Sequence, residues 1–285
     1  MVNASDNETS LREAVEFANS QVGAYTISFY LTVYVFRLPQ CLIAITVTLT
    51  FEGGAVFMIT GDAAGDDITD ANGITDVDAS GAGLLDDNSR IFNVTAGDLT
   101  LDSLTLTGGR TTADTADGGA VRSSGAVTVI DSTLSGNSTA VSAAFGRALS
   151  AGAATVIGST FSGNSAAGER AYGGGLAAYD ATLTDSSFTA NSTEGDTAFG
   201  GGAFAFTATM TGSTFSENAT AGTRAYGGGL AALDATVTNS TFGGNSTAGA
   251  AAYGGGLAAL DATLTNITVS GNSTTGPAAS GAGVS

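Results

Sequence analysis

The chain has 285 residues and a net charge of −18, from 26 acidic residues against 8 Arg, and it contains no Lys, His or Trp. Such an acidic surface repels nucleic acid and anionic lipid, so we expect neither nucleic-acid binding nor membrane insertion. Cys41 is the only cysteine, which excludes a disulfide framework and a cysteine-based metal site.

Residues 9–19 are the one good helix candidate in the chain. Thr9 or Ser10 can cap this helix, and Glu13, three residues after Ser10, completes a capping box. Gly23 then provides a stop signal. Four apolar residues share one face at helical spacing: Leu11, Ala14, Val15 and Ala18. A short amphipathic helix at this place is suited to covering the open end of a stack of strands.

The following segment, residues 30–60, is the least regular part of the chain, and its first stretch, residues 30–43, is far more apolar than the repeats. Arg37, Pro39 and Gln40 interrupt it near its centre, and β-branched residues dominate, so a membrane span is disfavoured. We expect either the first strands, packed under the cap, or an irregular insertion. Regular strand alternation resumes at residues 45–51.

An acidic segment comes next, in which Asp66, Asp67, Asp70 and Asn72 are the candidate metal ligands. Asp70-x-Asn72 followed by glycine is part of a calcium-loop pattern. However, Ile68 stands where a further ligand belongs, and no Glu closes the loop. Solvated turn residues are the plainer interpretation, and Ca²⁺ is the only cofactor that the sequence suggests.

From residue 118 onward the sequence repeats with a period of 27 residues and no insertion. Six asparagines mark the period: Asn137, Asn164, Asn191, Asn218, Asn245 and Asn272. Each is preceded by a large apolar residue three positions earlier, a Thr nine positions earlier and a Gly eighteen positions earlier. A strict period of this length indicates one structural unit stacked on itself.

One copy of the repeat indicates what the unit looks like. Residues 176–179, 181–185 and 187–189 each have the composition of a short strand, and Gly runs and Asn-Ser-Thr separate them as turns. Three such strands close one coil, and the next coil stacks on it at ~4.8 Å. We therefore predict an all-β fold, a right-handed parallel β-helix of 27-residue three-strand coils, since a left-handed one would show hexapeptide repeats. Stacked Asn side chains, which both donate and accept, would form a ladder.

We expect one continuous domain with three parts: an N-terminal helical cap at 1–29, irregular first coils at 30–117 and regular repeats at 118–285. No secretory signal is visible at the N-terminus. Residues 280–285 open a seventh copy of the repeat, and no polar cap follows them. We therefore expect a leader and further coils or an anchor beyond this sequence, or self-association through the uncapped C-terminal end.

A first candidate ligand surface is an array of outward threonines on four successive coils. Its members are Thr182, Thr184, Thr209, Thr211, Thr236, Thr238, Thr263 and Thr265. Regular Thr arrays resemble the faces of ice-binding solenoids. Thr is also a good strand former on a wet face, which is the simpler explanation.

A second candidate surface is an apolar stripe, which forms if Leu176 and Ala178 point inward. It would consist of Tyr179, Phe204, Phe206, Leu233 and Leu260. It would lie near four aromatic residues at the preceding corner of the coil: Tyr172, Phe199, Tyr226 and Tyr253. An exposed stripe of this size marks a contact surface for a partner or a second copy. If the strand is instead flipped or bulged, these residues belong to the core.

Catalysis has weaker support. Asp234 and Asp261 occupy equivalent positions in adjacent coils, and Asp180 lies in the same column, so two close carboxylates could serve a glycosidase. A lyase-like site would need a basic residue in a groove, and only Arg122 and Arg147 are placed for that role. Copying a repeat produces the same carboxylate pairs without any function, and the chain has no His or Lys for acid–base work. We therefore assign no catalytic residue.

The cap and the repeats together resemble a known group of proteins. The sequence reads Ser-Leu-Arg-Glu-Ala-Val at 10–15, Ala-Asn at 18–19 and Thr-Ile-Ser-Phe at 26–29, which is similar to the cap signature of CSLREA-type bacterial surface proteins. The Gly-Gly-Gly-Leu and Phe-x-x-Asn-Ser repeats resemble those of polymorphic outer-membrane proteins. Thr9 stands where that family usually has Cys, so a cap disulfide is absent. The resemblance implies secretion or surface display.

Together these observations predict a non-enzymatic protein, secreted or at the cell surface, that acts as an adhesin-like protein or structural scaffold. Its expected partners are a carbohydrate, a host surface or a second copy of itself. Two alternatives remain: a carbohydrate-active β-helix enzyme, either a polysaccharide lyase or a glycosidase, and an ice-binding protein that uses the Thr array.

Overall fold

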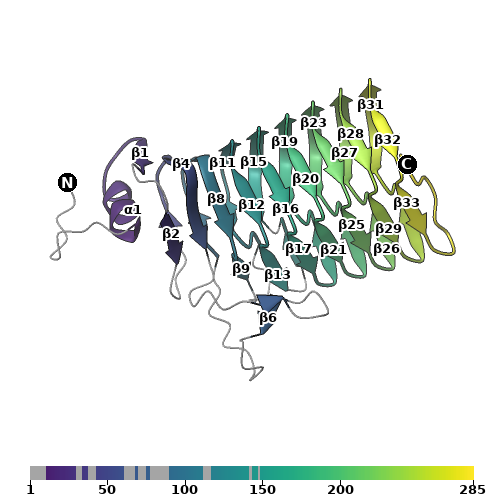
Figure 1. Cartoon of the computed structure of the whole chain (residues 1–285), viewed down its shortest axis with the longest axis horizontal. Coiled ribbons are helices and arrows are strands. Elements are labelled where there is room, and N and C mark those ends of the chain that lie inside the picture. Colours follow the sequence, from purple (N-terminus) through teal and green to yellow (C-terminus); the bar gives the residue numbers. More distant parts are fainter. Residues whose placement is uncertain are drawn as a thin grey trace.

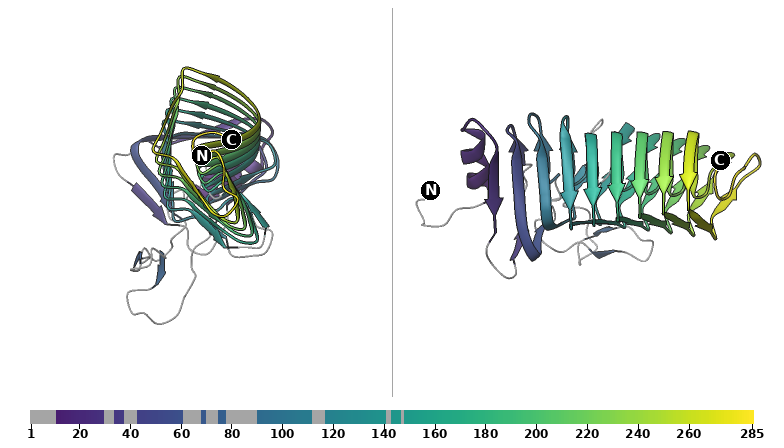
Figure 2. Two further views of the ribbon diagram at one scale, coloured as in Figure 1. Left: turned by 90° about the vertical axis from the view of Figure 1, so that its right-hand side faces the viewer. Right: turned by 90° about the horizontal axis from the view of Figure 1, so that it is seen from above.

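The computed structural model is an elongated stack of parallel β-coils with one helix at its N-terminal end (Figure 1). Seen along the stack, successive regular coils follow nearly the same outline (Figure 2). The predicted parallel β-solenoid is therefore confirmed. The structure describes residues 11–29, 34–37, 43–60, 68–69, 75–77, 90–111, 117–140, 143–146 and 148–285.

Helix α1, Leu11–Asn19, covers the N-terminal end of the stack. Asn19 fastens it to the first coils, because its Nδ2 donates to the carbonyl of Ala44 at 2.8 Å and its Oδ1 accepts from the N–H of Thr46 at 2.9 Å. Three of the four residues on its predicted apolar face are buried in the core: Leu11, Val15 and Ala18. The predicted cap helix is confirmed, and the expected N-cap residues lie outside the described part of the chain.

In the part of the chain that the structure describes, the strands form three long parallel sheets and one separate antiparallel pair. The largest sheet contains β1 (Tyr25–Ser28), β2 (Tyr34–Arg37), β3 (Ile43–Ile45), β4 (Leu49–Thr60), β7 (Phe92–Val94), β8 (Leu99–Thr107), β10 (Val121–Ser123), β11 (Ala126–Ile130), β12 (Thr133–Ser135), β15 (Leu149–Ile157), β16 (Thr160–Ser162), β19 (Leu176–Thr184), β20 (Ser187–Thr189), β23 (Ala203–Thr211), β24 (Thr214–Ser216), β27 (Leu230–Thr238), β28 (Thr241–Gly243), β31 (Leu257–Thr265) and β32 (Thr268–Ser270). The second contains β9 (Arg110–Thr111), β13 (Ser138–Ala140), β17 (Ser165–Ala167), β21 (Ser192–Glu194), β25 (Ala219–Ala221), β29 (Ser246–Ala248) and β33 (Ser273–Thr275). The third contains β14 (Ala143–Phe145), β18 (Arg170–Tyr172), β22 (Thr197–Phe199), β26 (Arg224–Tyr226) and β30 (Ala251–Tyr253). The antiparallel pair is β5 (Ile68–Thr69) and β6 (Thr75–Val77).

Strand boundaries differ from those expected within each coil. The two pieces predicted at 176–179 and 181–185 form one continuous strand, β19. The Asn-Ser-Thr stretch, predicted as a turn, contains the short strand β21, and β22 follows it. Ladder pairing with the coils on either side extends these short polar segments, which local turn propensity alone could not indicate. The apolar segment at 30–60 contributes β2, β3 and β4 to the largest sheet, and no helix in the described residues is long and apolar enough to cross a membrane.

The register between coils places equivalent residues directly opposite one another. The column that contains Thr182 runs through nine paired strands: Thr26, Thr50, Thr100, Thr128, Thr155, Thr182, Thr209, Thr236 and Thr263. Thr100 and Thr128 are partners although they are 28 residues apart, so the stacking absorbs a one-residue shift in the repeat. Copies of the repeat therefore lie on top of one another, as the period predicted.

The interior of the stack is built from columns of identical or similar apolar side chains. Phe161, Phe188, Phe215 and Phe242 are fully buried. Their ring centroids lie 4.8, 4.6 and 5.4 Å apart in succession, and the rings are stacked. A buried aliphatic column accompanies them: Val129, Val156, Leu183, Met210 and Val237. These columns supply most of the apolar burial that stabilises each coil on the next.

The predicted asparagine ladder is present inside the stack. Asn191 is fully buried, and its Nδ2 donates to Oδ1 of Asn218 at 3.0 Å and to the carbonyl of Phe161 at 2.9 Å. Its Oδ1 accepts from the backbone N–H of Asn164 at 3.1 Å and from Nδ2 of Asn164 at 2.8 Å. Because each rung both donates and accepts, the turns of successive coils are held in register and the buried amide groups of Asn164, Asn191 and Asn218 are all paired.

Candidate functional site

Each regular coil has a concave corner on its outer surface, where the third sheet meets the largest sheet. In one coil, β18 ends at Tyr172 and β19 begins at Leu176, with three glycines between them. A methyl group on Gly174 would lie 2.2 Å from the carbonyl oxygen of Gly201 in the next coil. Gly173 has a φ of +64°, which disfavours other residues. At these two positions of this coil, the close stacking therefore leaves room only for glycine.

The outer side of this corner carries a second apolar cluster, separate from the interior core. Its floor consists of Ala177, Phe204 and Ala231, which are 2–7% exposed, and Tyr172, Phe199 and Tyr226 pack over it. The rings along the third sheet form a ladder, with centroids 5.1 Å apart from Tyr172 to Phe199, 4.8 Å from Phe199 to Tyr226 and 5.3 Å from Tyr226 to Tyr253. We call this concave corner the aromatic groove.

The opposite side of the aromatic groove is a row of exposed apolar side chains. Its members are Tyr179 (65% exposed), Phe206 (39%), Leu233 (39%) and Leu260 (80%). The row exists because β19 bends: Ala178 and Ala181 both face the core, so the two residues between them, Tyr179 and Asp180, both face solvent. The predicted apolar stripe thus lies outside the core, as expected if Leu176 and Ala178 point inward.

Phe204 departs from this expectation, because it is 7% exposed and forms the floor of the groove rather than its rim. Its ring centroid lies 5.0 Å from that of Tyr172 and 5.6 Å from that of Phe206. Phe204 therefore links the aromatic ladder to the exposed row. It also divides the groove, since it lines both of the cavities found there.

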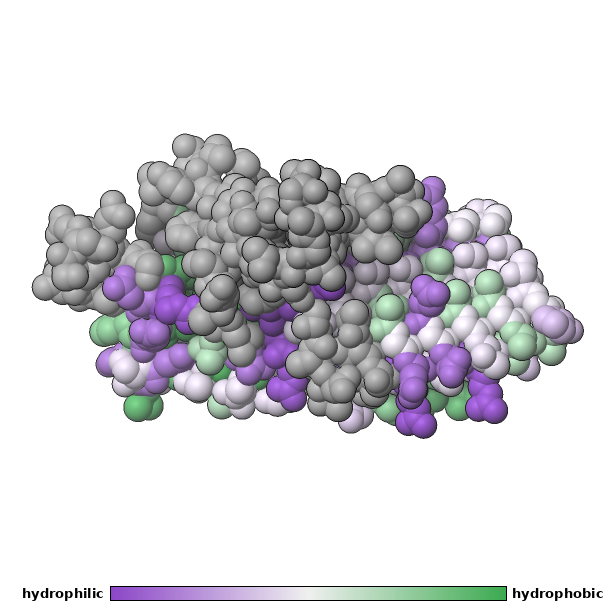
Figure 3. Space-filling view, turned by 90° about the horizontal axis from the view of Figure 1, so that it is seen from below, coloured by the Kyte–Doolittle hydropathy of each residue, from purple (hydrophilic) through white to green (hydrophobic). Residues whose placement is uncertain are grey.

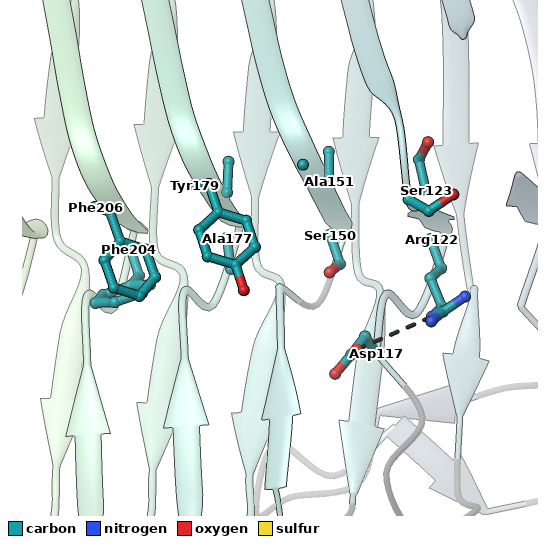
Figure 4. A pocket seen from close by; sticks show the side chains of 12 residues that line it. Asp117, Arg122, Ser123, Ser150, Ala151, Ala177, Tyr179, Phe204 and Phe206 are labelled. Atoms are coloured by element: carbon teal, nitrogen blue, oxygen red, sulfur yellow. Dashed lines mark ion pairs between the residues drawn. The ribbon is translucent and has the colours of Figure 1, made fainter. Parts of the chain in front are cut away.

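The cavity on the N-terminal side of Phe204 has a volume of about 230 Å³. It is lined by Asp117, Arg122, Ser123, Ser124, Ser150, Ala151, Gly152, Ala177, Ala178, Tyr179, Phe204 and Phe206. Figure 4 shows polar side chains at one end of this cavity and aromatic rings at the other. Nε of Arg122 lies 4.0 Å from Oδ2 of Asp117, and both side chains are partly exposed. This end of the groove is therefore a mixed polar and aromatic site.

The polar end arises from a change of residue type along the floor of the groove. Successive partners in this column are Asn93, Arg122, Ser150, Ala177, Phe204, Ala231 and Ala258. Sequence reasoning considered Arg122, with Arg147, only as a basic residue for a lyase-like site, and it missed the proximity of Arg122 to Asp117. The column register would have aligned Arg122 with Ser150 and Ala177, but the early coils do not keep the 27-residue period.

Arg90 lies behind this polar end. Its Nε donates to the carbonyl of Gly118 at 2.9 Å. Burial lowers the pKa of Arg90, and the nearby charge of Arg122 lowers it further, while Asp117 opposes both effects. The polar end is thus a charged cluster in which one carboxylate is placed close to two guanidinium groups.

The cavity on the C-terminal side of Phe204 has a volume of about 300 Å³ and is more apolar. Its lining is Phe199, Phe204, Tyr226, Ala231, Ala232, Leu233, Tyr253, Ala258, Ala259, Leu260 and Ser285. The two cavities together make the groove a continuous contact surface along several coils, polar at one end and apolar at the other.

The predicted Thr array lies further along the same long strands. Thr182, Thr209, Thr236 and Thr263 are exposed, and the second column, Thr184, Thr211, Thr238 and Thr265, is exposed or half-buried. Both columns are in register across four coils. Toward the N-terminus the second column changes to Ile157 and Ile130. Figure 3 shows one outer face, on which the C-terminal coils are mostly pale, with separate hydrophobic and hydrophilic residues.

The carboxylates considered for catalysis lie outside both cavities. Asp234 is paired directly with Asp261, while Thr207 stands between Asp180 and Asp234 in the column. All three Asp residues are exposed and none lines a cavity. In the part of the chain that the structure describes, no three His, Cys, Asp or Glu side chains gather as a metal site. The calcium candidates Asp66, Asp67, Asp70 and Asn72, and also Arg147, lie outside the described residues.

Comparison with known proteins agrees with this architecture. A family model described as the right-handed β-helix region matches residues 117–285, which is more than half of the chain. Neither the curated proteins nor the solved structures provide a match to the sequence. The matched segment contains the regular coils, the asparagine ladder and the aromatic groove. The chain therefore belongs to the right-handed β-helix family.

Proposed function

We propose that the protein is a non-enzymatic, adhesin-like β-helix, secreted or at the cell surface, that holds its partner in the aromatic groove. The observation that carries this proposal is the exposed apolar row beside the aromatic ladder, with Tyr179 65% and Leu260 80% exposed. Large apolar side chains gathered along a concave surface are typical of binding sites. A partner that covers these side chains removes apolar surface from water, and the stack of coils does not have to rearrange to bind it.

Surface location is supported by the resemblance of the cap and repeats to CSLREA-type and polymorphic outer-membrane proteins. The fold is also suited to this role, because a stack of coils carries the same groove residues over a long distance. An acidic surface favours a soluble, extended stalk over self-aggregation. A structural scaffold that displays this groove is the same proposal without a specific partner.

The groove chemistry favours binding over catalysis. Within the described residues, Asp117 is the one carboxylate that lines either cavity, and it lies beside Arg122. A glycosidase needs two carboxyl groups that face the same bond, and a lyase needs a base placed over its substrate. The arrangement offers contact area and hydrogen bonds at this site. Cleavage of a bound polysaccharide by the purified protein would refute the non-enzymatic part of the proposal.

Adhesion can be tested by measuring attachment of protein-coated beads to cells and to purified surface polysaccharides. We expect the double variant Tyr179→Ser/Phe206→Ser to attach much more weakly than the unchanged protein. The control is Thr182→Ser/Thr209→Ser on the outer Thr column, which should attach normally. Equal attachment by all three proteins, with circular dichroism showing equal folding, would contradict the assignment of the groove.

Ice binding is a second candidate because of one specific observation, the in-register Thr array. Two hydroxyl columns spaced at ~4.8 Å along the stack repeat across four coils, and the first column continues through nine. Measurement of thermal hysteresis tests this candidate. Hysteresis that disappears in Thr209→Tyr and persists in Tyr179→Ser would establish it, and no hysteresis in the unchanged protein would remove it.

A further inference from the structure

The N-terminal cavity of the aromatic groove has two unlike walls. One is apolar and aromatic, built from Ala177, Tyr179 and Phe206. The other is polar and contains Asp117 and Arg122, together with serine hydroxyls. A ligand that fills this cavity must therefore present an apolar surface on one side and hydrogen-bonding groups on the other.

The space for such a ligand comes from a change in the exposed row. Gly152 occupies the position that Tyr179, Phe206 and Leu233 hold in the following coils. The ring of Tyr179 stacks on Phe206 on one side, with centroids 5.0 Å apart. Toward the polar wall it has only Gly152 as its neighbour in the row. In Figure 4 the Tyr179 ring is seen nearly face-on, between Phe206 and the polar residues. It is thus an open aromatic platform.

The polar wall carries both signs of charge in close balance. Asp117 lies near Arg122 and Arg90. Asp117 and Arg122 are the charged residues that line this cavity, and their opposite charges face each other as an ion pair, while the whole chain carries −18. The site therefore offers strong donors and acceptors without attracting an anion.

We propose that this cavity binds one pyranose ring of a neutral glycan. This inference rests on the proposed adhesin-like function and names its ligand class. A pyranose has a C–H face that lies flat on an aromatic ring, and hydroxyls at its edge that both donate and accept. The C–H face packs on Tyr179, Arg122 donates to ring hydroxyls and Asp117 accepts from them. The remaining sugars extend along the groove toward Phe204.

Other ligand classes satisfy the cavity less well. A uronic or sialic acid would bring its carboxylate close to Asp117 in a strongly acidic protein, which disfavours binding. An apolar peptide segment would take the Asp117–Arg122 ion pair out of water without offering it hydrogen bonds, and this desolvation is costly. The mixture of a carboxylate, a guanidinium, hydroxyls and an aromatic face selects a neutral, hydroxyl-rich ring.

The test is titration of the whole chain with short neutral hexose oligosaccharides and with uronic-acid oligosaccharides of the same length, followed by calorimetry and saturation-transfer NMR. We expect saturation transfer to the ring C–H protons of the neutral series and tighter binding of that series. Tyr179→Ala should weaken binding about tenfold, the loss of one aromatic contact, and Tyr179→Phe should retain it. Ile157→Ala, which shortens an exposed apolar side chain that lines neither cavity, should bind within about twofold of the unchanged protein.

Asp117 provides a selectivity readout that loss of folding could not imitate. Asp117→Asn removes the negative charge but keeps an acceptor, so the preference for neutral over uronic-acid oligosaccharides should decrease. Tighter binding of the uronic series by the unchanged protein would overturn the proposal. Binding of neither series would overturn it too, as would equal losses in Tyr179→Ala and Ile157→Ala. If groove variants still abolish attachment to cells in those cases, the adhesin-like function stands and only the glycan assignment fails.

Discussion

The asparagine ladder makes a sharp prediction for the variant Asn191→Ala. The substitution removes four hydrogen bonds, two donated by Nδ2 and two accepted by Oδ1. Asn164 Nδ2 keeps its bond to the carbonyl of Leu134. The N–H of Asn164 loses the side-chain oxygen that it binds at 3.1 Å, in a buried position. A small methyl group also leaves space in a closely packed turn.

The size of the loss in free energy of unfolding depends on which buried groups lose their hydrogen-bond partner. A buried N–H without a partner costs about 1–3 kcal/mol, and each of the three other lost hydrogen bonds contributes about 1 kcal/mol. We therefore expect Asn191→Ala to lower the free energy of unfolding by about 4–6 kcal/mol. Asn191→Asp should be at least as damaging, because a buried carboxylate cannot donate to Phe161 or Asn218 and carries an uncompensated charge.

Urea unfolding followed by circular dichroism measures this loss, and hydrogen exchange of the Asn164 amide provides a local readout. The matched control is Asn272→Ala, which makes the same change at the last rung of the ladder. Asn272 is only partly buried, so water can replace its bonds to Asn245, and we expect less than half the effect. Equal losses from the two variants would refute the idea that burial gives the ladder its strength.

Three further predictions concern stacking and metal binding. Gly195→Ala should prevent close stacking, since the new methyl would lie 1.7 Å from the carbonyl oxygen of Gly168. The melting temperature of this variant should be far below that of the unchanged protein. Phe188→Ala should lower the free energy of unfolding in urea by about 3–5 kcal/mol, because it removes the middle of a fully buried ring column. If Asp70 belongs to a calcium loop, added Ca²⁺ should raise the melting temperature of the unchanged protein and leave that of Asp70→Ala unaffected; equal responses would argue for solvated turns.

Most of the architecture could be predicted because the repeat imposes a strong condition. An asparagine every 27 residues has few explanations other than stacked coils, and the paired columns of Asn191 and Phe188 follow from it directly. The cap helix was predictable for a different reason, because its apolar face and length are local properties. Strand limits were less predictable, since Ser192–Glu194 is polar and is a strand only because its neighbours are.

The groove was only partly predictable. Its exposed row depends on the bend between Ala178 and Ala181, and a period-two pattern cannot show where two successive residues turn outward. The burial of Phe204 could not be predicted, because the same strand position is Ala in the coils on either side. Only the structure shows that Tyr172 and Phe199 pack against the Phe204 ring and cover it. The polar end was harder still to predict. Asp117 precedes the regular repeat, and only the fold of the corner shows that its side chain lies beside Arg122.

The one-for-one pairing of coils has a consequence for the length of the molecule. Because Thr182 meets Thr209 and Thr209 meets Thr236, excision of residues 192–218 would join two chain ends that already occupy equivalent places. The shortened protein would keep every column, with one rung fewer in each. Excision of a segment one residue shorter would leave one coil of 28 residues, which is the spacing that already separates the partners Thr100 and Thr128. The length of the stack can therefore change by whole coils while the interior columns are kept, so recombination alone could lengthen or shorten the molecule.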